Sequence, residues 1–468
     1  MNQVTGSKGS MLYLGVISFI ATLGGFLFGF DTAVISGTIG FLKSQFSLDA
    51  VMEGWVVSSA LVGCIVGVMG AGTLSDRFGR KKMLLLSAIL FFASAIGAAL
   101  PQTAQGLIIA RLVGGIGIGM ASMLSPMYIS EFSPPHLRGR LVALYQFAIT
   151  LGILCAYFSN AVLLHVSEGG SAFAGGLLHY VVIQEVWRSM FGIAVIPSGL
   201  FFLLLLFVPE SPRWLMKQGY DAKATRVLAR VAGDRSAAAE AVEIRGALSQ
   251  ESGSILQLLN PGLRVALLIG VLLPFFSQVS GINVIIYYGP KIFKEAGFTL
   301  SEALGGAVSI GIVNVLATLI AIWKVDKWGR KPLLVWGISG VVTTLALVGL
   351  LFFANASSGP WLLVLFLVYC ACFAVSFGPG VWIVISEIFP TRIRGRAMAI
   401  GTFCVWATNA VVGQTFPWLL ENLGPAGTFW IFAGLCVPAI FVVWKIVPET
   451  KGKSLEQIEA FWLASKQA

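Results

Sequence analysis

One aspartate stands alone in a long uncharged segment of the chain. Asp31 is the only charged residue between Met11 and Leu42, a stretch long enough to cross a bilayer as a helix. A carboxylate in hydrocarbon costs about 2.5–3.5 kcal/mol on insertion scales. A second isolated charge, Arg111, lies in another apolar stretch. An acid and a base in such surroundings suit either a structural ion pair or a site that binds and releases a proton.

The expected depths of these two residues agree. Asp31 lies six residues before Gly37, and Arg111 lies six residues after Gln105. If their helices run in opposite directions, both side chains lie roughly 9 Å from the outer helix ends, at 1.5 Å per residue. A buried pair often stabilises a fold no better than apolar residues of the same shape. We therefore favour the proton site, in which protonation of Asp31 loosens its pairing with Arg111.

The composition of the chain places it in a membrane. Its 468 residues are 57% hydrophobic and 11% charged, whereas soluble domains are about 25% charged. The net charge of +10 does not indicate nucleic-acid binding, because the basic residues lie in short turns rather than on one face. The six cysteines all lie in apolar segments, so the sequence predicts neither disulfides nor a metal site.

Twelve apolar segments are long enough to be membrane-spanning helices. They cover about 11–37, 54–74, 84–100, 105–131, 141–164, 187–208, 264–290, 303–324, 332–353, 361–388, 397–420 and 426–446. An even number of spans puts both termini on one side of the membrane. Lys and Arg concentrate in the turns on that side, so the positive-inside rule predicts that both termini are cytoplasmic. Lys43, Lys291 and Lys294 are the exceptions.

Two halves of the chain repeat the same motifs in the same order. GTLSDRFGRKK at 72–82 returns as IWKVDKWGRKP at 322–332, and SEFSPPHLRGR at 130–140 returns as SEIFPTRIRGR at 386–396. Duplicated halves of six spans each indicate a transporter with its substrate site near the midplane between the halves.

The predicted fold class is therefore an all-α membrane protein with twelve transmembrane helices in two pseudo-symmetric six-helix bundles. Its four predicted parts are an N-terminal bundle, a cytoplasmic linker with short amphipathic helices, a C-terminal bundle and a cytoplasmic tail, at 1–208, 209–263, 264–446 and 447–468.

The motifs resemble those of a known family. GxxxDRxGRK after the second span is typical of the major facilitator superfamily, and four further motifs resemble its sugar-porter branch. These are RxxGG at 111–115, PESPRWL at 209–215, QVSGINVIIYY at 278–288 and PETKG at 448–452. The chain resembles bacterial D-xylose–proton symporters and, more distantly, facilitative glucose transporters. The resemblance implies alternating access and a monosaccharide substrate such as D-xylose or D-glucose.

The resemblance also bears on proton coupling. Proton-coupled members carry an aspartate at the position of Asp31, and uncoupled glucose carriers carry a neutral residue. The xylose symporters lead us to expect a second carboxylate near Ala194, where this chain has none. Whether coupling through Asp31 alone is tight is left open.

A sugar requires amide side chains for its hydroxyls and an aromatic surface for its ring. Polar and aromatic residues of the predicted spans offer both, namely Phe28, Gln146, Tyr157, Gln278, Asn283, Asn314, Trp382, Trp406 and Asn409. The resemblance places Gln278, Asn283, Asn314 and Trp382 at sugar-binding positions of the family, and Trp406 in the pocket lining. Bonding between helices is the alternative for the amides, and plain packing is the alternative for Trp406.

Three positions depart from the family pattern. Ser277, Ile153 and Val405 stand where the xylose symporters resembled here have glutamine. Each lost amide removes hydrogen bonds worth about 0.5–1.5 kcal/mol. The identity of the sugar is therefore left open.

Charged residues also recur at fixed offsets near the predicted cytoplasmic helix ends. The positive-inside rule explains the basic ones but not the acidic ones. We predict ion pairs that hold the helix ends together when the cytoplasmic side is closed. Their members are Asp76, Arg80, Glu131, Arg138, Arg140, Glu210, Arg213, Asp326, Arg330, Glu387, Arg394, Arg396 and Glu449.

The sequence favours a proton-coupled monosaccharide symporter, a monomer in the inner membrane that needs no cofactor, its coupling ion being the proton. A uniporter of the same fold is the first alternative, and a sugar sensor would need a longer cytoplasmic tail. A membrane enzyme would need paired carboxylates or a histidine constellation. The three histidines, His136, His165 and His179, lie in turns without such neighbours, and no nucleotide-binding motif is present.

Overall fold

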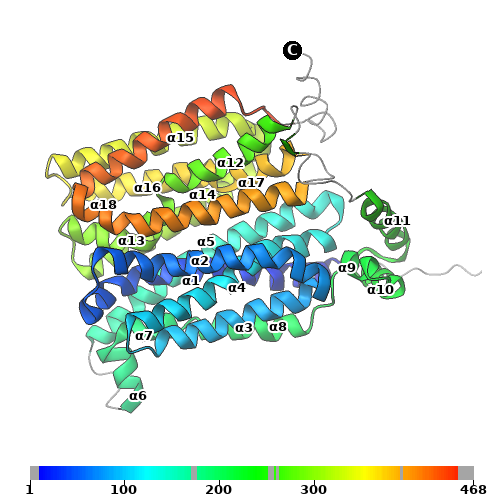
Figure 1. The fold of residues 1–468 in the computed structure, drawn as a ribbon, viewed down its shortest axis with the longest axis horizontal. Helices are drawn as coiled ribbons and strands as arrows, with labels where there is room; N and C mark the ends of the chain where they lie inside the picture. Colours follow the sequence, from blue (N-terminus) through cyan, green and yellow to red (C-terminus); the bar gives the residue numbers. More distant parts are fainter. Residues whose placement is uncertain (1–9, 170–175, 251–257, 260–262, 390–393, 452–468) are drawn as a thin grey trace, which may run out of the picture.

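The computed structural model describes residues 10–169, 176–250, 258–259, 263–389 and 394–451, which form a bundle of long, roughly parallel helices (Figure 1). The helices of the first half are α1 (Met11–Phe46), α2 (Ala50–Phe78), α3 (Arg80–Ala99), α4 (Ala104–Phe132), α5 (Pro135–Glu168), α6 (Gly176–His179), the π-helix η1 (Tyr180–Gln184), α7 (Val186–Gly192) and α8 (Val195–Leu206). The linker contains α9 (Pro212–Lys217), α10 (Asp221–Ala232) and α11 (Asp234–Gln250).

The helices of the second half are α12 (Arg264–Val279), α13 (Ile282–Glu295), α14 (Leu300–Trp328), α15 (Arg330–Phe353), α16 (Pro360–Val375), α17 (Phe377–Ile388) and α18 (Arg394–Lys445). Eleven helical segments of the described residues are long and apolar enough to cross a membrane. The last of them holds two helices joined at a kink at Gly424, where φ is 69° and ψ is 171°. The described part of the chain thus contains the twelve predicted spans.

Three spans are interrupted near their middles. The seventh consists of α12 and α13, which meet at Gly281, whose φ of 82° lies in the left-handed region that glycine adopts readily. The tenth breaks between α16 and α17 at Ser376, and the sixth breaks between α7 and α8 beside Ala194. Breaks inside membrane spans are tolerated where they are buried in protein or line a cavity. They therefore mark the parts of the fold suited to a substrate site.

Glycines allow close packing within the first half. A Cβ on Gly115 of α4 would lie 1.9 Å from the carbonyl oxygen of Ala60 on α2, so only glycine fits there. Small residues of this kind let transmembrane helices approach closely. This contact fixes α4, which carries Arg111, against α2.

The two halves meet along three helix pairs, α2 with α18, α5 with α14, and α1 with α13. Helices α9, α10 and α11 pack on one another at one end of the bundle (Figure 1) around a small apolar cluster that includes Leu215, Met216 and Leu228. We call the end of the bundle opposite these helices the outer end, following the orientation predicted from the sequence.

Candidate proton and sugar sites

Asp31 on α1 and Arg111 on α4 face each other across the interior of the first half. Arg111 Nη2 lies 4.0 Å from Asp31 Oδ2, with the arginine side chain 3% exposed and the aspartate 20%. Arg111 Nε donates to the Val56 carbonyl oxygen of α2 at 2.8 Å. Nη1 is buried and has no hydrogen-bond partner among the described residues. Because 4.0 Å is too long for a hydrogen bond, the two side chains interact through charge alone.

The predicted distance of Asp31 from its helix end is wrong. Helix α1 continues past Gly37 to Phe46, so 15 residues (46 − 31), or about 22 Å, separate Asp31 from that end. Arg111 lies seven residues (111 − 104) from the start of α4, or about 10 Å. The pair still forms because α1 extends about 12 Å beyond α4 at the outer end.

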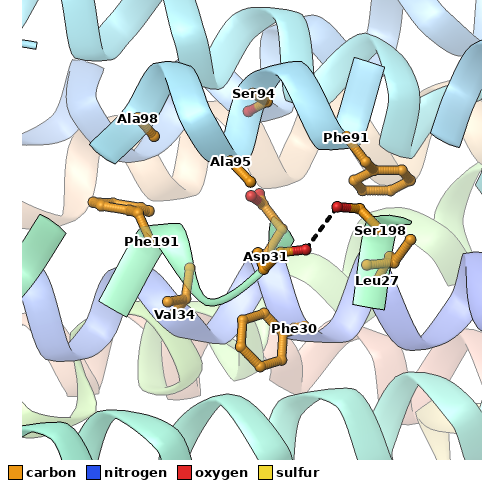
Figure 2. A pocket seen from close by; sticks show the side chains of 11 residues that line it. Leu27, Phe30, Asp31, Val34, Phe91, Ser94, Ala95, Ala98, Phe191 and Ser198 are labelled. Atoms are coloured by element: carbon orange, nitrogen blue, oxygen red, sulfur yellow. Dashed lines mark hydrogen bonds between the residues drawn. The ribbon is translucent and has the colours of Figure 1, made fainter. Parts of the chain in front are cut away.

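A small cavity adjoins Asp31 (Figure 2). Helices α1, α3, α7 and α8 supply its lining, which includes Ser94, Phe191 and the Ala194 segment between α7 and α8. Its volume is ≈ 10 Å³, about the space needed for one water molecule. The dashed line in Figure 2 marks the hydrogen bond from Ser198 Oγ to the Ala194 carbonyl oxygen, 2.7 Å. Among the residues that line this cavity, Asp31 is the only ionisable one.

Ala194 stands where the resemblance led us to expect a second carboxylate. This residue lies in the wall of the cavity beside Asp31. A methyl group stands here, so the lining offers Asp31 no second acid to share a proton with. Any proton taken up at this cavity is therefore bound by one carboxylate.

Two of the predicted sugar ligands flank the break of the seventh span. Asn283 Nδ2 donates to Gln278 Oε1 at 2.6 Å, and Gln278 Nε2 donates to Ser277 Oγ at 3.0 Å. Ser277 Oγ in turn donates to the Pro274 carbonyl oxygen at 2.8 Å, so the polar chain ends on the backbone of α12. This chain holds the two amides in fixed orientations beside Gly281.

Asn409 of α18 has a polar atom without a partner. Its Nδ2 donates to the Tyr287 hydroxyl of α13 at 3.0 Å. Its Oδ1 is buried and has no hydrogen-bond partner among the described residues. A buried acceptor left unsatisfied costs about 1–3 kcal/mol. A hydroxyl donated by a bound molecule would remove that cost.

Two predicted residues form an aromatic contact between the halves. The ring of Phe28 on α1 lies 5.1 Å from that of Trp406 on α18, centroid to centroid, at an interplanar angle of 53°. Tyr157 of α5 also bridges the halves, because its hydroxyl donates to the Ile286 carbonyl oxygen of α13 at 3.1 Å. The Tyr157 hydroxyl is therefore occupied by the protein itself.

The other predicted sugar ligands are not joined to these pairs by hydrogen bonds within the described part of the chain. Asn314 is buried on α14, whereas Trp382 on α17 and Gln146 on α5 are half-buried. Trp382 follows the break of the tenth span at Ser376.

Tyr287 is a residue that the sequence analysis did not single out. It binds Asn409 and is close enough to Asp31 and Arg111 to interact electrostatically with both. It therefore lies beside Asn409 and in the neighbourhood of the Asp31–Arg111 pair. Its position in the QVSGINVIIYY motif was the available signal.

In the first half, the predicted cytoplasmic charges are brought together around Arg80. Its guanidinium contacts Asp76 at 2.8 Å and Glu131 at 3.2 Å. Glu210 accepts hydrogen bonds from the backbone N–H groups of Arg80 and Lys81, at 3.0 and 3.1 Å. Burial nevertheless raises the pKa of Glu210 above its usual value.

The second half repeats this arrangement. Arg330 Nη2 contacts Glu387 at 3.0 Å, and Glu449 accepts from the backbone N–H groups of Arg330 and Lys331, both at 3.1 Å. Burial acts to raise the pKa of Glu449, but three backbone N–H donors and the charge of Arg330 together outweigh it and the pKa is lowered. Each of these contacts joins helix ends within one half.

The remaining residues of the predicted cytoplasmic ion pairs differ in exposure and in partners. Arg138 and Arg140 are exposed, and Arg213 and Arg396 have interaction partners of their own. The side chains of Asp326 and Arg394 lie outside the described part of the structure.

Two further buried charges lie near the outer end and were not singled out from the sequence. Glu53 of α2 is fully buried, and Arg188 of α7 is 2% exposed. Arg188 pairs with Glu185 and donates to the Ala99 carbonyl oxygen at 2.9 Å. Both charges stand at a predicted span end, where a charge is unremarkable in a sequence.

Comparison with known proteins agrees with this architecture. The family model described as sugar (and other) transporter matches residues 17–462. The chain belongs to this sugar transporter family. Its members are transporters, so the chain is a membrane-spanning transporter and not an enzyme.

Individual relatives match along nearly their whole length. The chain is 46% identical over 455 residues to the arabinose-proton symporter of Bacillus subtilis (strain 168), covering 97% of this chain and 96% of the relative. It is 40% identical to the D-xylose-proton symporter of Escherichia coli (strain K12), covering 96% of each. The partially occluded inward open structure of the xylose transporter XylE from E. coli superposes with a TM-score of 0.82 at 38% identity, covering 95% of this chain and 100% of that one.

Proposed function

We propose that the chain is a proton-coupled symporter that imports a monosaccharide, with Asp31 as the proton-binding group and Arg111 as its counter-charge. The relatives named above carry pentoses together with protons by their names, which supports sugar–proton symport in this chain. Pentoses are therefore the first sugars to test, and hexoses follow.

The observation that carries the proton site is the looseness of the Asp31–Arg111 pair. At 4.0 Å and without a hydrogen bond, the arginine does not hold the carboxylate oxygens in place. Its Nε is bound to Val56 instead, so Arg111 keeps a partner when Asp31 becomes neutral. Protonation of Asp31 thus removes the counter-charge of Arg111 but leaves this hydrogen bond in place.

Access supports the same assignment. The Asp31 side chain is 20% exposed and borders a cavity of about one water molecule. A proton reaching it by way of water would meet no competing acid in the cavity lining. One bound proton per transport cycle follows from one carboxylate.

The sugar is proposed to bind where the two halves meet, beside the break at Gly281. Gln278 and Asn283 supply donors and acceptors on one side, and Asn409 Oδ1 supplies a buried acceptor. Phe28 and Trp406 supply the aromatic surface. Tyr287, which accepts a hydrogen bond from Asn409, lies in the neighbourhood of Asp31 and Arg111. Asn314, Trp382, Gln146 and Tyr157 remain proposed lining residues.

The setting of the transporter is also a proposal. We infer a monomer in the inner membrane with both termini cytoplasmic, surrounded by lipid, without a cofactor or a nucleic-acid partner. The ion pairs around Arg80 and Arg330 each lie within one half, so they would hold the cytoplasmic helix ends of that half together.

A sugar-induced proton flux tests the function directly. Sugar added to energy-depleted cells that express the protein in a weakly buffered medium is expected to make the medium alkaline for a substrate sugar. L-arabinose, D-xylose, D-galactose and D-glucose are compared in the same cells. Radiolabelled sugar entering without any alkaline shift would identify a uniporter and overturn proton coupling.

A further inference from the structure

A buried glutamate joins three helices at the outer end of the molecule. Glu53 lies in the first turn of α2 and is fully buried. Its Oε1 accepts a hydrogen bond from Lys291 Nζ of α13 at 2.5 Å, and its Oε2 lies 3.5 Å from Lys43 Nζ of α1. One carboxylate therefore serves two lysines, one in each half of the protein.

These contacts account for two of the three exceptions to the charge rule. Lys43 and Lys291 are basic residues on the side of the membrane where the positive-inside rule expects few. Both pair with Glu53, so they have a structural role that the rule does not cover. Lys294, the third exception, is exposed on α13.

Further polar contacts close the same end. Ser58 Oγ of α2 donates to Gln414 Oε1 of α18 at 2.6 Å, and Gln414 Nε2 donates to the Val51 carbonyl oxygen at 3.0 Å. A Cβ on Gly54 would lie 2.5 Å from the Gln414 carbonyl oxygen. The halves are therefore in direct contact around Glu53.

We propose that Glu53 and Lys291 form the outer-gate ion pair of this transporter, and that Lys43 holds Glu53 when the gate opens. Opening the outer end separates α13 from α2 and breaks the Lys291 contact. It leaves the Lys43 contact intact, because α1 and α2 belong to the same half. Removing one partner of a buried pair costs about 3–5 kcal/mol when the remaining charge is left uncompensated. Lys43 removes most of that penalty from the open state.

The position of Lys291 connects the gate to the substrate region. Asn283, Tyr287 and Lys291 follow one another at intervals of four residues along α13. Residues spaced by four lie on one face of a helix. A sugar that binds Asn283 would act on the face of α13 that carries Lys291, and so favour or release the Glu53 contact. Lys291 is thus a positioning residue for the transport cycle.

Thiol labelling from outside tests the gate. The reporter is Ser58→Cys, at a site buried between the halves, in protein whose six native cysteines are replaced by serine or alanine. A membrane-impermeant maleimide is added to right-side-out vesicles without sugar or proton gradient. Because neither is present, failure here is distinguishable from failure of the proposed function.

The labelling rate is expected to change in opposite directions when the two lysines are replaced. Lys291→Met opens the gate and raises the labelling rate at least tenfold. Lys43→Met destabilises the open state and lowers the rate below that of the parent. Lys294→Met, the matched control on α13, leaves it unchanged.

A labelling rate in Lys291→Met equal to that of the parent overturns the proposal. A second measurement avoids the altered cysteines. In the otherwise native chain, Lys291→Met raises the outward-open fraction, and the apparent affinity for sugar offered from outside rises by the same factor. An unchanged outside affinity in Lys291→Met, with Lys294→Met as its reference, also counts against the gate.

Discussion

The replacement of Asp31 by asparagine removes the proposed proton site with little change in shape. The structure allows its cost to be estimated. Two unit charges 4.0 Å apart attract by about 4 kcal/mol at an effective dielectric constant of about 20. Burying the carboxylate costs about 2.5–3.5 kcal/mol. The two terms nearly cancel, so Asp31→Asn should fold with a stability within about 1 kcal/mol of the native chain.

The effect on transport should be large by contrast. A membrane potential of 100 mV supplies about 2.3 kcal/mol for each charge that crosses. Since about 1.4 kcal/mol corresponds to a factor of ten, coupling to one proton permits a sugar gradient of about 50-fold. Asp31→Asn binds no proton and should equilibrate sugar to a ratio of about 1. It should still exchange labelled for unlabelled sugar, because exchange needs no net proton movement.

Purified protein in vesicles gives the measurement. Radiolabelled sugar is followed at an imposed potential of 100 mV, inside negative, and again in counterflow without a potential. Asp49→Asn is the matched control, because Asp49 is exposed and caps α2 through the Met52 N–H, a role that asparagine also fills. Accumulation by Asp31→Asn at the level of Asp49→Asn would refute the assignment of the proton site.

Other residues give independent expectations. Gln278→Ala and Trp382→Ala should each weaken sugar binding at least tenfold by calorimetry, because each removes a proposed contact; unchanged affinity would exclude that residue from the site. Gly281→Ala should lower Tm, since alanine at a φ of 82° costs about 1–2 kcal/mol; an equal Tm would show that the break tolerates a side chain. Glu449→Gln should lower Tm at pH 7, because the lowered pKa of Glu449 means that its ionised form stabilises the fold. That difference should vanish as the pH falls through the lowered pKa, and a difference independent of pH would contradict this reasoning.

The sequence was sufficient to predict the membrane spans and the pairing of Asp31 with Arg111. Apolar runs must become helices in a bilayer, because backbone polar groups need internal partners. Asp31 and Arg111 were paired for a similar reason, since an isolated charge in hydrocarbon needs a counter-charge. The outer part of α1 was missed because Lys43 and its neighbours extend beyond the apolar run, where no hydrocarbon requirement shapes the sequence.

Contacts between residues far apart in the sequence could not be predicted from the sequence. Glu53 and Lys291 are separated by 238 positions, and each looks like an ordinary charge near a helix end. Asn409 and Tyr287 are 122 positions apart, and no periodicity relates them. Gln278 and Asn283 were predicted as polar residues of the site, but the hydrogen bond that Ser277 accepts from Gln278 is apparent only in the folded chain.

The charge clusters around Arg80 and Arg330 lie wholly within their own halves. These bonds stay intact when one half rotates against the other, so each half can move as a rigid body. Among the described residues, the polar bonds across the seam are few, and they include Glu53 with Lys291, Ser58 with Gln414 and Tyr157 with Ile286. One or two substitutions at the interface between the halves can therefore raise or lower the transport rate of such a protein. The residues that bind its substrate need not change.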